Sequence, residues 1–178
     1  VFMERGYLEN FIQATFDAIG GGNGKKLIVG GDGRYFNKPA IQTILKMAAA
    51  NGVSEAIVGQ GGILSTPAAS HLIRLNQADG GFILSASHNP GGIDEDFGVK
   101  FNGENGGPAP ENLTTRIFEA TKVIAEFQTL DASDINLEVV GGSSLGDMRV
   151  CVVDPVKAYQ GLMESLFDFD GIREMFAN

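Results

Sequence analysis

The apolar positions in the first half of the chain alternate between helical and strand spacing. One face of a helix is formed by Phe11, Ile12, Thr15, Phe16 and Ile19, and a glycine cluster at 20–24 ends it. Short apolar runs predict buried strands at 26–30, 55–58 and 82–84. Helices are expected between these strands, one opened by Pro39 and closed by Asn51-Gly52, and one capped by Ser65-Thr66-Pro67.

This alternation predicts an α/β domain, a layered structure with a mainly parallel, mixed sheet flanked by helices. Parallel neighbours need crossover connections of about a dozen residues or more, and the intervening helices supply them. The second half predicts a strand at 99–102, a helix from Glu111 to about Phe127, strands at 135–140 and 148–153, and a last amphipathic helix after Asp154-Pro155. At 178 residues, the chain is expected to form a single domain over 1–178.

Composition and charge narrow the classes of partner. A net charge of −9 argues against nucleic acid and anionic membranes, which both reward clustered Lys and Arg. No apolar stretch approaches the length of a membrane span, and the single cysteine, Cys151, excludes an internal disulfide. The sequence therefore favours a cytoplasmic location, and its acidic charge is a difficulty for binding a phosphorylated substrate.

The main candidate for chemistry is the segment Ser85–Pro90, which directly follows the strand at 82–84. It places a hydroxyl, an imidazole and a carboxamide at the carboxyl end of a strand, where open α/β sheets bind ligands. The Gly-x-Ser-x-Gly elbow of a hydrolase is absent around Ser87. From residue types alone, Ser87 is either a structural turn serine or an acceptor of phosphate, whose charge Lys100 or Arg34 and a divalent cation would neutralise.

Two other motifs give weaker evidence for a ligand site. The turn Gly31–Phe36 resembles the start of a dinucleotide fingerprint but has Phe36 where the third glycine belongs, so we expect a tight turn with Asp32 bonding backbone amides. The acids Asp94–Asp96 lack the spacing of a calcium loop, which favours a solvated acidic loop.

The segment Ser85–Gly92 resembles the phosphoserine loop of the α-D-phosphohexomutases. Further segments resemble the first domain of that family in order, at 30–35, 48–52, 62–68, 96–102, 105–110 and 153–169. The Gly106–Pro110 turn favours the glucose-type branch of the family over the mannose-type branch. The resemblance therefore implies the first-domain fold of these enzymes across nearly the whole chain.

The resemblance also implies a reaction and its residues. Ser87 would carry a phosphoryl group and interconvert glucose 1-phosphate and glucose 6-phosphate through glucose 1,6-bisphosphate. Mg²⁺ would bind an oxygen of the Ser87 phosphate, His88 would bind the sugar, and Lys100 would assist proton transfer and stabilise charge. These three residues are the expected catalytic and substrate-binding groups.

The family's enzymes have four domains, and no metal loop of the type Asp-Gly-Asp-Gly-Asp occurs in these 178 residues. We therefore expect this polypeptide to need the family's downstream domains as partners and to be inactive alone. A non-catalytic phosphosugar-binding or interaction module of the same fold is the alternative. The intact Ser87-His88-Asn89-Pro90 segment favours the enzyme.

Overall fold

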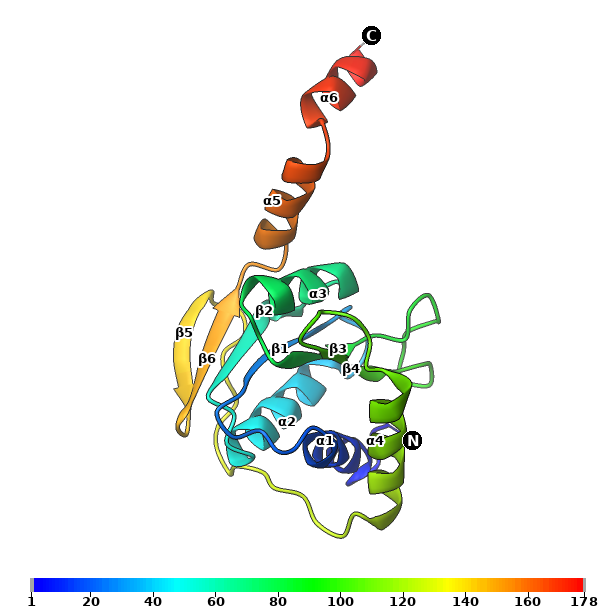
Figure 1. The fold of residues 1–178 in the computed structure, drawn as a ribbon, viewed down its shortest axis with the longest axis vertical. Coiled ribbons are helices and arrows are strands. Elements are labelled where there is room, and N and C mark those ends of the chain that lie inside the picture. Colours follow the sequence, from blue (N-terminus) through cyan, green and yellow to red (C-terminus); the bar gives the residue numbers. More distant parts are fainter. Residues whose placement is uncertain (1, 178) are drawn as a thin grey trace.

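The chain folds into a six-stranded sheet with helices on both faces and a helical extension at its C-terminal end (Figure 1). The computed structural model describes residues 2–177. The helices are α1 (Tyr7–Ala18), α2 (Asn37–Ala50), α3 (Thr66–Leu75), α4 (Glu111–Val123), α5 (Lys157–Leu166) and α6 (Phe169–Ala177). The strands are β1 (Lys26–Gly31), β2 (Glu55–Ile63), β3 (Gly80–Leu84), β4 (Val99–Gly103), β5 (Gly141–Leu145) and β6 (Met148–Val153).

The strand order is β4-β3-β1-β2-β6-β5, with β1 paired in parallel to both β2 and β3. Strand β6 is parallel to β2, whereas the two edge strands β4 and β5 are antiparallel to their neighbours. The mainly parallel, mixed sheet expected from the alternation of strands and helices is confirmed. In this order, the carboxyl ends of β1 and β3 lie side by side at the same edge of the sheet.

Side chains of alternate residues on the central strands pack into two separate hydrophobic cores, one on each face of the sheet. On β1, Leu27 and Val29 join the core beneath α1 and α2, while Ile28 joins the core beneath α3. Helices α1, α2 and α4 lie on one side of the sheet and α3 on the other (Figure 1). Burial of both faces explains why the parallel strands are continuous apolar runs.

Helix α3 begins as its sequence predicts. The Ser65 side chain accepts a hydrogen bond from the backbone N–H of Ala68 at 3.3 Å, and Pro67 lies in the first turn, where it needs no intrahelical donor. The amino end of α3 therefore lies directly after β2, at the edge of the sheet that carries the Ser87 segment.

Two element predictions in the second half are wrong. The helix expected to reach about Phe127 ends at Val123, because Ile124 has extended backbone angles. The segment 135–140 is not a strand. Its backbone is bound by α2 and β2 instead, since Gln42 donates to the Ile135 carbonyl at 2.8 Å and the Leu137 carbonyl accepts from Gly61 N–H at 2.7 Å. The edge strand β5 forms further on, from Gly141.

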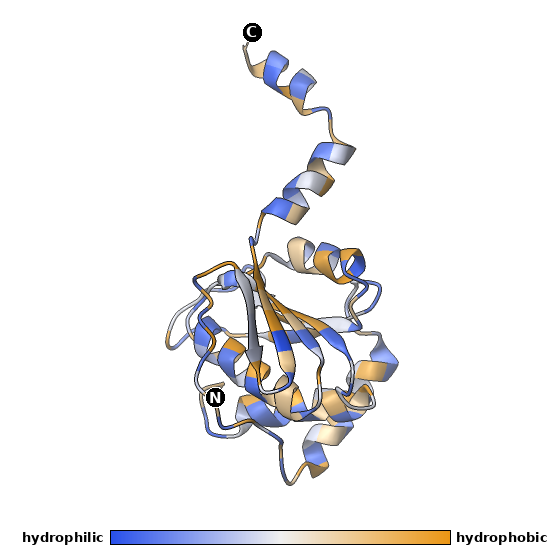
Figure 2. Ribbon diagram, turned by 90° about the vertical axis from the view of Figure 1, so that its left-hand side faces the viewer, coloured by the Kyte–Doolittle hydropathy of each residue, from blue (hydrophilic) through white to orange (hydrophobic). Residues whose placement is uncertain are grey.

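Helices α5 and α6 extend away from the sheet (Figure 2). Neither helix contains a buried residue, and only Ala158 and Tyr159 of α5 pack against the core beneath α3. Apolar residues are exposed along this extension, including Leu166, Phe167, Met175 and Phe176. We refer to residues 156–177 as the C-terminal arm.

Candidate active site

The Ser87 segment forms the loop 85–98 that joins β3 to β4, which we call the serine loop. Its base is closed by the antiparallel pair Leu84 and Val99. Just inside this base, a Cβ atom at Gly98 would collide with the Ser85 carbonyl oxygen. The two ends of the loop are therefore packed backbone to backbone, and only glycine fits at position 98.

Ser87 is exposed and has a left-handed backbone, with φ of 57°. Such a conformation costs a non-glycine residue roughly 1–2 kcal/mol, so surrounding contacts must hold it. Its N–H donates to the Ser85 side-chain oxygen at 3.1 Å, and Asn89 N–H donates to the Ala86 carbonyl at 3.2 Å. The Ser87 hydroxyl itself makes no hydrogen bond among residues 2–177, which leaves it free for a substrate.

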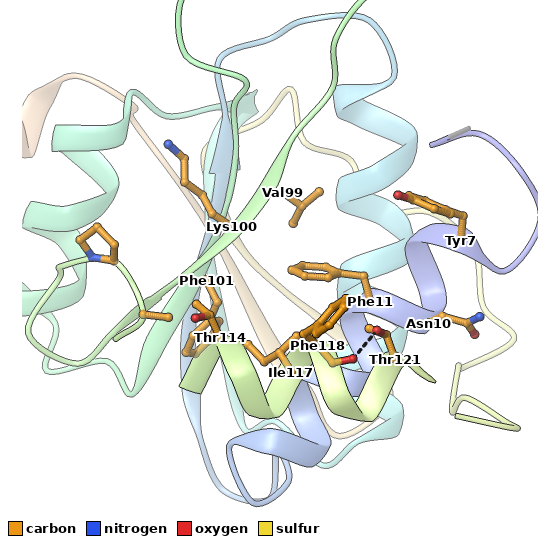
Figure 3. Close-up of a pocket in the computed structure, with 12 residues that line it drawn as sticks. Tyr7, Asn10, Phe11, Val99, Lys100, Phe101, Thr114, Ile117, Phe118 and Thr121 are labelled. Atoms are coloured by element: carbon orange, nitrogen blue, oxygen red, sulfur yellow. Dashed lines mark hydrogen bonds between the residues drawn. The ribbon is translucent and has the colours of Figure 1, made fainter. Parts of the chain in front are cut away.

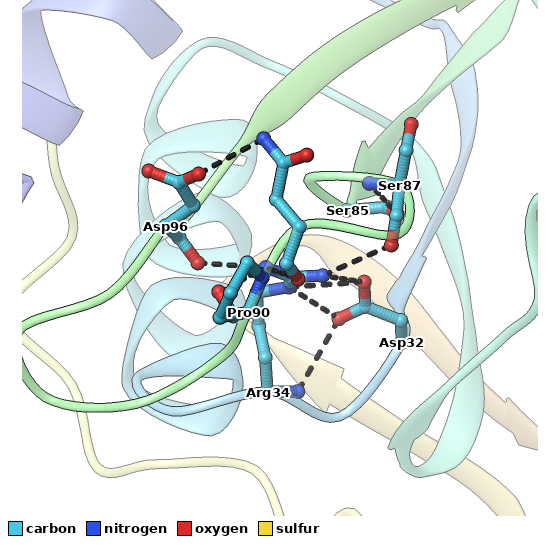
Figure 4. A network of polar contacts seen from close by, with 7 residues as sticks. Asp32, Arg34, Ser85, Ser87, Pro90 and Asp96 are labelled. Atoms are coloured by element: carbon cyan, nitrogen blue, oxygen red, sulfur yellow. Dashed lines mark hydrogen bonds and ion pairs between the residues drawn. The ribbon is translucent and has the colours of Figure 1, made fainter.

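An ion pair from the end of β1 lies beneath the serine loop (Figure 4). Arg34 contacts the Asp32 carboxylate through Nε at 3.0 Å and Nη2 at 2.9 Å. The same guanidinium donates to loop carbonyls, to Asp96 at 2.7 Å, Ser87 at 3.3 Å, and Asn89 and Pro90 at 3.4 Å. The Arg34 side chain is only 8% exposed, so its charge is taken up by the protein itself.

The electrostatics of this pair are mutually supporting. Partial burial acts to raise the pKa of the Asp32 carboxyl, but hydrogen bonds from Arg34 and Ser85 outweigh it and hold the pKa below its usual value. The hydrogen bond to Asp32 raises the pKa of Arg34 further above its already high value. Both groups therefore stay charged at neutral pH.

The far side of the loop is closed by its own polar groups. Asn89 donates from its side chain to the Asp96 carboxylate at 2.9 Å, and Asp96 N–H donates to the Pro90 carbonyl at 3.1 Å. Asp94 and Glu95 are exposed between them. Residues 2–177 bring together no group of three or more His, Cys, Asp or Glu side chains able to hold a metal ion. The described residues alone therefore do not fit a magnesium site, to which a phosphate on Ser87 would contribute one oxygen ligand.

Of the other two expected site residues, His88 lies in the loop next to Ser87, and Lys100 lies just outside the loop on β4. His88 is exposed, and its imidazole makes no hydrogen bond within the described part of the chain. Lys100 lies on β4 opposite Ile83, one pair below the loop base. Its half-buried side chain has no ionic partner among residues 2–177.

A cavity lies elsewhere, between α1, α4 and β4. It measures about 650 Å³ and is lined mainly by apolar side chains, among them Phe11, Ile117 and Phe118. Figure 3 shows that Val99 and Lys100 leave β4 in opposite directions, so the Lys100 ammonium points away from these side chains. Val99 and Lys100 contribute to its lining, so the cavity reaches the loop base through β4, although the Lys100 ammonium is directed away from it.

Arg34, a candidate cation for phosphate from its residue type, has a structural role, because its guanidinium is committed to Asp32 and to four loop carbonyls. The expected bond from Asp32 to a backbone amide is present, with Arg34 N–H as the donor at 3.3 Å. The signal available in the sequence was an Asp-x-Arg turn at the end of β1, the strand adjacent to β3.

Comparisons with known proteins agree on the relatives of this chain. Residues 1–128 match the family described as phosphoglucomutase/phosphomannomutase, alpha/beta/alpha domain I. A phosphoglucomutase of Rhizobium radiobacter is 54% identical over 99% of this chain, and a cytoplasmic phosphoglucomutase of Populus tremula is 50% identical over all of it. The chain spans 33% of the length of each.

A solved structure extends the likeness to three dimensions. The open form of pp63/parafusin from Paramecium, an exocytosis-sensitive phosphoprotein also described as a phosphoglucomutase, superimposes with a TM-score of 0.93 at 43% identity. The match covers 99% of this chain and 34% of that protein. The chain therefore belongs to the phosphoglucomutase/phosphomannomutase family, as its alpha/beta/alpha domain I.

Proposed function

We propose that this chain is the phosphoserine-bearing domain of a phosphoglucomutase and that Ser87 is its phosphoryl carrier. The observation that supports this most directly is the geometry of Ser87, an exposed serine whose hydroxyl has no hydrogen-bond partner among residues 2–177, on a loop that is otherwise fixed by hydrogen bonds. The loop lies at the carboxyl ends of parallel strands, where α/β sheets bind ligands. The 54% identity to a phosphoglucomutase favours the exchange of glucose 1-phosphate and glucose 6-phosphate as the reaction.

The reaction is a pair of phosphoryl transfers. In the first, the bond from phosphorus to Ser87 Oγ breaks while a bond forms to the free hydroxyl of a glucose monophosphate, whose proton is released. The product is glucose 1,6-bisphosphate and unmodified Ser87. In the second transfer, Ser87 Oγ loses its proton and attacks the other phosphorus, the bond from that phosphorus to the sugar oxygen breaks, and the sugar oxygen takes up a proton to become a free hydroxyl. The net change is an exchange of glucose 1-phosphate and glucose 6-phosphate.

His88 and Lys100 are the residues of this chain that assist Ser87. His88 is adjacent to it and exposed, so its imidazole is available to bind the sugar. Lys100 has no ionic partner in the described part of the chain, so its charge can compensate the phosphate and assist the proton transfer. Phosphoryl transfer depends on this kind of positioning and charge stabilisation. Mg²⁺, when bound to a Ser87 phosphate oxygen, would supply further positive charge and draw its remaining ligands from outside these residues.

The site is completed by domains beyond this chain. Besides the Ser87 hydroxyl, the candidate site offers His88 of the loop and Lys100 of β4, in a chain with a net charge of −9, which is little positive charge for binding a bisphosphate. The isolated polypeptide is therefore expected to fold but not to turn over glucose phosphates. The complete enzyme is expected to act in the cytoplasm, like the similar enzyme of Populus tremula. Among residues 2–177, no helix is both long enough and apolar enough to cross a membrane.

The test is the conversion of glucose 1-phosphate to glucose 6-phosphate by the full-length protein, with Mg²⁺ and catalytic glucose 1,6-bisphosphate. The proposal expects turnover in the wild type and none in Ser87→Ala. Binding of glucose 1,6-bisphosphate without conversion or phosphate exchange would instead identify a non-catalytic phosphosugar-binding module. Turnover by the isolated 178-residue chain at the full-length rate would contradict the need for further domains.

A further inference from the structure

Both peptide groups that flank Ser87 are fixed by hydrogen bonds, one of them to Arg34. On the carboxyl side, Arg34 Nη2 donates to the Ser87 carbonyl at 3.3 Å. On the amino side, Ser87 N–H donates to the Ser85 hydroxyl at 3.1 Å. That hydroxyl faces Asp32, whose pKa it helps to lower. The strained backbone of Ser87 is therefore held on its carboxyl side by Arg34 and on its amino side by Ser85 (Figure 4).

The donors of Arg34 are all directed inward. Its Nε and Nη2 groups are used by Asp32 and the Ser87 carbonyl, while Nη1 reaches carbonyls at both ends of the turn, those of Asn89, Pro90 and Asp96. A guanidinium has five N–H donors in a fixed plane, so it can bridge several carbonyls at once. Since the side chain is 8% exposed, it is not available to a phosphate in solution.

We propose that Arg34, oriented by Asp32, is the positioning residue of the serine loop. It fixes Ser87 in the left-handed conformation that displays the hydroxyl, and it does so without touching the reacting atoms. The structural part of this inference stands on the contacts of the loop, whereas its kinetic part rests on the proposed function. The consequence is that loop order and phosphoryl transfer depend on an arginine that binds no substrate.

Lysine is not an adequate replacement. Its ammonium is a single point of charge with three donors, and cannot span Asp32, the Ser87 carbonyl and the Asp96 carbonyl together. Arg34→Lys should therefore keep the charge and the fold but release part of the loop. Arg34→Met should release more of it, because it removes every donor.

The experiment compares Arg34→Met and Arg34→Lys with Arg74→Met in the full-length protein. Arg74 is a matched control, because it also anchors a loop, donating to the Ser70 side chain at 2.9 Å and to the Asn105 carbonyl at 3.4 Å. Thermal unfolding first establishes that each variant is folded. Amide hydrogen exchange of residues 85–98 then reports loop order, and steady-state kinetics report kcat and KM for glucose 1-phosphate.

We expect faster exchange in the serine loop of both Arg34 variants and unchanged exchange there in Arg74→Met. We expect kcat to fall about tenfold or more in Arg34→Met, since misplacing a reacting group by about 1 Å can cost a factor of 10². KM should change less than kcat, because Arg34 does not contact the sugar. If Arg34→Met is unfolded, the Arg34→Lys result decides.

Unchanged exchange in the loop of a folded Arg34 variant would overturn the proposal, whatever its activity. So would a loosened loop with kcat within about threefold of wild type, or the same changes in Arg74→Met. If the wild type has no mutase activity, the proposed function fails separately, and the exchange measurement alone still decides whether Arg34 positions the loop.

Discussion

The serine loop and the C-terminal arm achieve order in opposite ways. The loop has no regular secondary structure and most of its side chains are exposed, yet its backbone is anchored by Arg34, by Ser85 and by the Asn89–Asp96 contact. The arm is regular helix, yet α5 and α6 bury no residue of their own. Regular structure and tertiary anchoring are therefore separate properties in this molecule.

Polar interactions are concentrated in the serine loop and not in the C-terminal arm. Backbone carbonyls that would otherwise be solvated are gathered onto one buried guanidinium in the loop, which fixes a strained serine. In the arm, by contrast, apolar side chains such as Phe176 are left uncovered. A local change should thus alter chemistry in the loop and alter little in the arm of this chain.

The largest expected effect is the loss of chemistry in Ser87→Ala. Because no other residue would accept the phosphoryl group, kcat of the full-length enzyme should fall by about 10⁴-fold or more. Ser143→Ala is the control, since Ser143 is an exposed serine on β5. Residual kcat in Ser87→Ala above one tenth of wild type would show that the loop is not the carrier.

A smaller effect is expected from a substitution that disrupts the packing at the base of the serine loop. Gly98→Ala places a methyl group against the Ser85 carbonyl, so the loop must shift, and the free energy of unfolding should fall by about 1–3 kcal/mol. Chemical denaturation measures this. Gly142→Ala is the matched control, because a Cβ there meets nothing within 4 Å. Equal effects of the two substitutions would contradict the packed loop base.

Acid should loosen the loop before it affects the arm. The folded pKa of Asp32 lies below its unfolded value of about 3.9, so its contribution is fully present above that value and is lost as pH falls through the folded pKa. Hydrogen exchange of residues 85–98, corrected for intrinsic rates, should therefore rise below about pH 4. Asp32→Asn should remove this step, and a step that persists in Asp32→Asn would assign it to another carboxyl.

The smallest effect is expected in the arm. Phe176 is 80% exposed, so Phe176→Ser should change the free energy of unfolding of the 178-residue chain by less than about 0.5 kcal/mol. The same denaturation experiment measures it. A loss above about 1.5 kcal/mol would mean that the arm packs on the domain and that the contrast with the loop is false.

Hydrophobic spacing was sufficient to predict the strands β1, β3 and β6, because each is a short apolar run. The residues Ser65-Thr66-Pro67 were sufficient to predict the cap of α3. Hydrophobic spacing failed at 135–140, which has the alternating pattern of a strand. Backbone carbonyls of this segment accept hydrogen bonds from Gln42 and Gly61, but the segment does not pair as a strand. Ser87 was found from its place after β3. The full role of Arg34 was not, since the loop carbonyls that it binds are 53 to 62 residues away in the chain and only the pairing of β1 with β3 brings them close to it.

The central claim is that Ser87 carries the phosphoryl group on an anchored loop. Its most direct measurement is peptide mapping of the full-length protein after incubation with glucose 1,6-bisphosphate labelled in its phosphates. We predict label on the peptide that contains Ser87, and loss of that label when unlabelled glucose 1-phosphate is added. Label on another residue, no label, or label on Ser87 that the sugar phosphate cannot remove would contradict the claim.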